Sequence, residues 1–77
     1  MDIKVLRKRI DSIYREHLNR LDVGIENQNT SLIASASWKL MFLIEIMEKC
    51  MIYPHSHCIC LRADIGERIE RGRKNEC

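Results

Sequence analysis

Apolar residues in the first part of the chain recur with the period of an α-helix. They fall on two neighbouring stripes, Ile3, Leu6, Ile10 and Ile13 on one and Tyr14, Leu18, Leu21 and Ile25 on the other. The opposite side is polar and mostly charged. Asp2 is a suitable N-cap, because its carboxylate can accept a hydrogen bond from the free amides of a first helical turn. The pattern predicts an amphipathic helix over about residues 3–23.

The second segment, SLIASASWKLMFLIEIMEKCM, is apolar on almost every side when it is drawn as a helix. Gly24 and the polar run at 26–29 predict a turn before it, and Asn29 or Thr30 can cap its first amides. Pro54 disfavours helical geometry at the residue before it, which ends the helix. We therefore expect a helix over about residues 31–52. A helix that is apolar nearly all round belongs in the middle of a structure.

The third segment begins after Pro54, with Ser56 as an expected N-cap. Four of its residues share one apolar helical stripe, namely Cys58, Leu61, Ile65 and Ile69. Gly72 is a natural C-terminal stop. These signals predict a helix over about residues 57–71, and the whole chain, residues 1–77, reads as a single all-α domain of three helices with the hydrophobic one at its centre.

The chain has only 77 residues, and folding buries only about 60% of the surface of so short a chain. Two amphipathic neighbours cannot cover a central helix that is apolar on most sides, so part of it should remain exposed as an interaction surface. We expect this surface to form a homodimer, to bind another protein, or both. The residues predicted to make these contacts are Trp38, Leu40, Met41, Phe42, Leu43 and Ile46.

The charge pattern narrows the classes of partner. The net charge is +2, and the basic clusters near both ends are interleaved with acids, several of them four residues away from an arginine or lysine. Such pairs are typical of a solvated helix face, and the bias is too small to favour nucleic-acid binding. The expected ion pairs are Asp11–Arg15, Glu16–Arg20, Glu67–Arg71 and Glu70–Lys74.

No membrane partner is expected either. The apolar part of the second segment runs only from Leu32 to Met47 and is interrupted by Lys39 and Glu45, whereas a spanning helix needs about 20 predominantly apolar residues. The N-terminus lacks the pattern of a signal peptide. We therefore expect a cytoplasmic protein whose four cysteines are reduced.

One cluster carries residues that bind metals or act as nucleophiles. Its candidates for zinc are Cys50, His55, His57, Cys58 and Cys60. A single residue separates the members of each close pair, and on a helix positions 58 and 60 point about 200° apart, so the spacing does not favour a shared ion. A nucleophile formed by Cys58 with His55 or His17 is not singled out either. We expect no cofactor, no metal and no enzymatic activity.

The stretch ENQNTSLIASASWKLM resembles small enterobacterial regulators of the AraC-negative-regulator family and, more distantly, PerC-like regulators. The similar features are a polar turn with Asn29, then Ala34, Ala36 and Trp38 on a helix, followed by Leu40 and Leu43, and a later helix with Cys58, Cys60 and Arg62. The resemblance implies a small helical dimer that binds an AraC-type virulence activator. It would block the activator's dimerisation or DNA contacts, as a negative regulator of transcription.

A second resemblance is to the helical-hairpin phosphatases of the sporulation phosphorelay, through LRKRI and SWKLMFLI. Ser37 and Leu40 match the motif on their second helix, but Met41 stands where these phosphatases have an aspartate. The acid that would take part in the reaction is therefore missing, and the binding function is preferred. A helical accessory module of phage or plasmid origin and a small zinc-binding protein are the alternatives.

Overall fold

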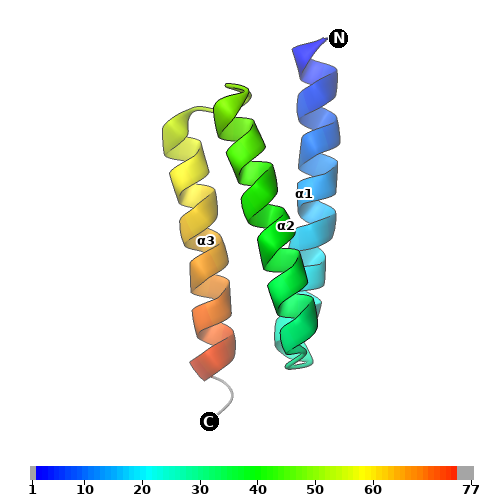
Figure 1. Cartoon of the computed structure of the whole chain (residues 1–77), viewed down its shortest axis with the longest axis vertical. Coiled ribbons are helices and arrows are strands. Elements are labelled where there is room, and N and C mark those ends of the chain that lie inside the picture. The colour runs from blue at the N-terminus through cyan, green and yellow to red at the C-terminus, as the bar shows by residue number, and fades with distance from the viewer. Residues whose placement is uncertain (1, 75–77) are drawn as a thin grey trace.

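The computed structural model describes residues 2–74 and consists there of three helices without a strand. They are α1 (Ile3–Glu26), α2 (Thr30–Lys49) and α3 (His55–Lys74). Figure 1 shows α1 and α2 as an antiparallel hairpin. The third helix, α3, lies beside α2 and runs parallel to α1. The predicted all-α fold with three helices is confirmed.

The turn between α1 and α2 lies later than the sequence suggests, because α1 ends at Glu26 rather than near residue 23. Gly24 is a buried residue inside α1, and a Cβ atom there would lie 3.2 Å from the backbone nitrogen of Ile33. Gly24 therefore permits the close approach of α2 instead of making a turn. The predicted cap of α2 is confirmed, since the side chain of Asn29 accepts a hydrogen bond from the amide of Leu32.

The corner between α2 and α3 also differs from the prediction. The second helix ends at Lys49 instead of near residue 52, and α3 begins at His55 instead of 57. The amides of His57 and Cys58 donate to the carbonyl oxygen of Pro54, so Pro54 takes the capping position that the sequence assigned to Ser56.

The third helix does not stop at Gly72 but continues to Lys74. A Cβ atom at Gly72 would lie 2.5 Å from a methyl carbon of Ile25 in α1. This glycine therefore allows α1 and α3 to approach each other, as Gly24 does for α1 and α2.

The core lies between the three helices. Its buried members are Ile10, Tyr14 and Leu21 from α1, Ala36, Leu40, Ile44 and Met47 from α2, Ile52 from the corner, and Cys58 and Ile65 from α3. The contact between α1 and α2 is the most extensive of the three helix pairs. Only one side of α2 is used in this way, which leaves its other side without cover among the described residues.

Polar contacts form both within single helices and between the corner and α1. Two of the predicted ion pairs, Glu16–Arg20 and Glu67–Arg71, are confirmed. Asp11 instead accepts a hydrogen bond of 2.7 Å from the hydroxyl group of Tyr53, which ties the corner to α1. The fourth expected pair, Glu70–Lys74, involves a side chain that lies outside the described residues.

Candidate functional site

The most exposed large apolar residues on α2 form one continuous feature. Trp38 is 69% exposed and Phe42, one helical turn later, is 52% exposed. Their ring centroids lie 5.8 Å apart and their planes differ by only 7°, so the two rings stack against each other. Met41, 38% exposed, flanks them. A stacked Trp–Phe pair directed into water is an unusual use of large side chains in a small protein, which makes this face of α2 the candidate for a contact surface.

The six residues predicted to contact a partner differ in how exposed they are. Leu40 has no exposed area and belongs to the core, so its assignment to the contact surface is corrected. The reason is helical geometry, since position 40 points about 160–200° away from positions 38 and 42. Leu43 and Ile46 are half-buried, so Trp38, Met41 and Phe42 are the exposed members of the set.

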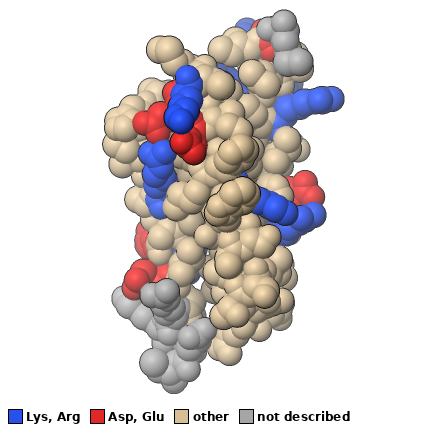
Figure 2. Space-filling model, viewed as in Figure 1, with Lys and Arg blue, Asp and Glu red and all other residues tan. Residues whose placement is uncertain are grey.

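Charged groups border this apolar surface but do not cover it. Figure 2 shows a broad region of uncharged residues down the middle of this face, with basic and acidic side chains on both sides of it. Near the end of α2, Glu45 and Lys49 form an ion pair of 3.0 Å with each other. The exposed face is thus aromatic in the middle and charged at its C-terminal end.

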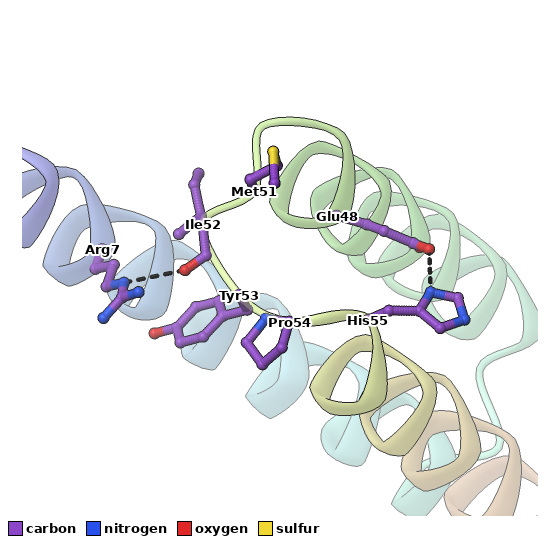
Figure 3. Close-up of a pocket in the computed structure, with 7 residues that line it drawn as sticks. All are labelled: Arg7, Glu48, Met51, Ile52, Tyr53, Pro54 and His55. Atoms are coloured by element: carbon purple, nitrogen blue, oxygen red, sulfur yellow. Dashed lines mark hydrogen bonds and ion pairs between the residues drawn. The ribbon is translucent and has the colours of Figure 1, made fainter.

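A pocket of about 390 Å³ lies at the α2–α3 corner, lined by Arg7, Glu48 and residues 51–55. In Figure 3 the Nε of Arg7 donates to the carbonyl oxygen of Ile52, and Glu48 contacts the ring of His55. The guanidinium of Arg7 also lies over the Tyr53 ring, 5.2 Å from its centroid. These polar groups pair with one another, and the contacts of Arg7 tie the corner between α2 and α3 to α1.

Electrostatics agrees with a structural role for Glu48. Hydrogen bonds from His55 and Arg62 lower the pKa of its carboxyl group, and the Nη2 of Arg62 lies 2.8 Å from the carboxylate. The carboxylate therefore stays charged and joins α2 to the first turns of α3.

The cysteines and histidines of the corner are not gathered around a common point. Cys50 and Cys60 are exposed, whereas Cys58 is buried in the core. The ring of His57 packs on Tyr53 with centroids 4.5 Å apart. Among residues 2–74 no group of three or more His, Cys, Asp or Glu side chains could hold a metal ion.

The buried thiol is also poorly suited to nucleophilic chemistry. Burial, and next the negative charge of Glu48, raise the pKa of Cys58, which keeps the sulfur protonated, whereas a nucleophile needs the thiolate. His17, the other histidine considered for such a pair, has a buried Nδ1 atom without a hydrogen-bond partner within the described part of the chain.

By length and composition alone, α2 is apolar enough to cross a membrane. The core helix of a soluble protein meets the same criterion, and one side of α2 does pack in the core through Leu40 and Ile44. The criterion therefore gives only weak evidence about the environment of the exposed side.

Comparison with known proteins adds no assignment. No protein-family model matches the chain, and no curated protein or solved structure matches it significantly. What the exposed face of α2 does must therefore be argued from its own chemistry.

Proposed function

We propose that this protein acts by binding another polypeptide through the exposed face of α2 and that it has no enzymatic activity. The observation that carries the proposal is the stacked pair of Trp38 and Phe42, which lies largely in water. Removing two such side chains from water is worth on the order of 3–6 kcal/mol. Aromatic residues at the centre of a surface are also the usual anchors of protein interfaces.

The partner we favour is a transcription activator of the AraC type, which the protein would antagonise in the cytoplasm. The resemblance of the segment around Trp38 to the AraC-negative-regulator family supports this choice. A helix that presents an apolar face can dock into a groove between helices of a target. Docking of this kind would cover a surface that the activator needs for its own dimerisation or for contacting DNA. An accessory module of phage or plasmid origin would use the same face on a different target.

The experiment is an affinity capture from the native cell with tagged wild-type protein beside the double variant Trp38→Ala/Phe42→Ala. We expect the wild type to retain a transcription regulator and to lower its occupancy at its promoter. The double variant should retain at least about tenfold less of the regulator, because both anchors are lost. Met51→Ala is the matched control, since Met51 is exposed but lies at the corner outside α2.

Equal capture by the wild type and the double variant, with equal helix content, would contradict the proposal. Capture that depends on Trp38 and Phe42 but yields a protein of another class would keep the binding function and replace the target.

A further inference from the structure

The exposed face of α2 follows a heptad pattern, on the side of the helix away from the buried positions that face the core. Its members are Ser31, Ser35, Trp38, Phe42, Glu45 and Lys49, spaced by four, three, four, three and four residues. All six are exposed. Alternating spacings of three and four place side chains along one seam, which is the pattern by which two helices pack against each other. We call these six residues the outer seam.

The outer seam is symmetric about the level of Leu40. The mirrored pairs are Trp38 with Phe42, Ser35 with Glu45, and Ser31 with Lys49. When a second copy of α2 lies antiparallel across the first, with the two-fold axis at this level, each residue of the seam faces its mirror partner. Such an interface is isologous, so it closes after two copies.

The charges favour this antiparallel arrangement over a parallel one. In a parallel pair in register, Glu45 would face Glu45 of the second copy and Lys49 would face another Lys49, and like charges directly opposite repel. In the antiparallel pair each charged side chain instead faces a serine of the other copy. A serine hydroxyl can donate to the carboxylate of Glu45 or accept from the ammonium group of Lys49, and the ion pair between Glu45 and Lys49 is kept.

The shapes of the side chains are compatible with the same arrangement. The N-terminal half of the seam is small, with Ser31, Ser35 and the neighbouring exposed Ala34, so the ends of the two helices can approach closely. The stacked rings of Trp38 and Phe42 meet those of the second copy at the centre, where both pairs of rings lose their contact with water. In this arrangement each copy contributes one helix of 20 residues to the contact.

We propose that the outer seam of α2 binds a second copy of this chain in antiparallel orientation, with the two-fold axis between the Trp38–Phe42 pairs, an assignment that rests on the proposed binding function of the same face. The dimer forms in the micromolar concentration range. Self-association and target binding then compete, because both need the same aromatic pair. The free target-binding form is the monomer, and the concentration of the protein regulates its availability.

The test is sedimentation equilibrium of the full chain under reducing conditions, which prevents disulfides between the exposed cysteines. Because Trp38 is the single tryptophan of the chain, its fluorescence reports the same equilibrium. Its emission should move to longer wavelength as the dimer dissociates on dilution. Replacing both aromatic anchors, in Trp38→Ala/Phe42→Ala, should abolish the dimer while the helix content stays unchanged.

Two substitutions at one position test the orientation. Ser35→Lys places a positive charge opposite Glu45 of the second copy, and this pair occurs twice in the dimer, so we expect about fivefold tighter association. Ser35→Glu should weaken association by about the same factor. The effects of these two substitutions on the stability of a single α2 helix have the opposite sign. Position 35 precedes Lys39 by four residues, so a lysine there is repelled by Lys39 and a glutamate is attracted to it. A dimer tightened by Ser35→Lys therefore cannot result from a more stable helix.

A chain that sediments as a monomer at all concentrations up to the millimolar range would overturn the proposal. So would a dimer that Ser35→Lys weakens, because this is the response of a parallel pair. A monomer whose Trp38 emission shifts to shorter wavelength with phosphatidylcholine vesicles would overturn it in favour of a membrane surface. A monomer that still captures a regulator through Trp38 would overturn the self-association alone, whereas a dimer with the expected Ser35 responses that captures no regulator would overturn the proposed function alone.

Discussion

At the scale of single residues, Tyr14 is the core residue with the most unusual environment. It is only 7% exposed, and its hydroxyl group has no hydrogen-bond partner in the described part of the structure. Burial, assisted by the negative charge of Asp64, raises the pKa of Tyr14 to about 12, while Arg68 opposes the shift. The core therefore accepts this side chain as a neutral phenol and resists its ionised form.

This environment predicts how stability depends on pH. The pKa of Tyr14 is higher in the folded chain, about 12, than its ordinary value of 10.0, so its contribution is complete below pH 10 and is lost as the pH rises from 10 to 12. In Tyr14→Phe we expect a shallower loss over this range, and at pH 7 a free energy of unfolding that is unchanged or higher, because an unpaired buried hydroxyl is removed. Urea denaturation at several pH values measures both effects.

Some loss of stability at alkaline pH should remain in the Tyr14→Phe variant. A hydrogen bond to Asp11 raises the pKa of Tyr53 as well, so the ionisation of this second tyrosine also lowers the stability at alkaline pH. In the double variant Tyr14→Phe/Tyr53→Phe, the free energy of unfolding should therefore depend less on pH than in either single variant. A pH profile of Tyr14→Phe that coincides with that of the wild type would show that Tyr14 ionises as easily in the folded chain as in the unfolded one.

The sequence located Tyr14 correctly on an apolar stripe of α1, but a stripe carries no information about hydrogen-bond partners. The same limit applies to neighbouring residues on α2. Leu40 and Met41 are adjacent and equally apolar, yet Leu40 is completely buried and Met41 is exposed. On a helix that is apolar all round, only the positions of α1 and α3 decide which side becomes the core.

At the scale of the helices and turns, both corners close with the same motif. Gln28 has a φ of 53° and Met51 a φ of 56°, and each follows the last residues of a helix. The amides of Asn29 and Ile52 donate back to the carbonyl oxygens of Gly24 and Met47, which is the hydrogen bonding of a Schellman motif. Glycine is the usual residue at the left-handed position, and its absence explains why the sequence placed both helix ends a few residues away.

The glycines of this chain serve contacts between helices, and this gives a prediction that compares two of them. A Cβ atom at Gly66 in α3 would meet nothing within 4 Å, whereas one at Gly24 would lie 3.2 Å from the backbone and side chain of Ile33. Gly66→Ala should raise the free energy of unfolding by about 1 kcal/mol, the difference in helix propensity. Gly24→Ala should gain less or lose stability, because the same gain is opposed by crowding against α2.

Thermal denaturation followed by circular dichroism measures both substitutions, with each variant examined below the concentration at which the chain associates. An equal gain from Gly24→Ala and Gly66→Ala would show that α1 and α2 can separate slightly at no cost. It would remove the close approach of these helices as the reason for a glycine at position 24.

At the scale of the whole molecule, Arg68 connects the first helix to the third. Its Nη1 donates to both carboxylate oxygens of Asp22 in α1 at 2.7 and 2.8 Å, and its Nε donates to Asp64 at 2.9 Å. The hydrogen bond that Arg68 donates to Asp22 is the main reason that the pKa of Arg68 is raised. Since α1 and α3 have the smallest contact of the three helix pairs, this network is important for their relative position.

We expect Arg68→Gln to lower the free energy of unfolding by about 1 kcal/mol, because two carboxylates lose their shared cation. Arg71→Gln is the matched control, since Arg71 pairs only with Glu67 on the same helix, and its effect should stay below about 0.5 kcal/mol. Chemical denaturation at low and high NaCl measures the difference, which should shrink as salt screens the charges. Equal effects of the two substitutions would contradict the bridging role of Arg68.

By itself, the sequence determined that this protein is a bundle of three helices, because the period of its apolar residues, the cap at Asn29 and the break at Pro54 are local properties of the chain. It also determined that α2 carries more apolar surface than its neighbours can bury. Only the tertiary structure decided where that excess lies. The packing of α1 and α3 took Leu40 into the core and left Trp38 and Phe42 stacked in water, because burial depends on contacts between residues far apart in the chain, which no local pattern encodes.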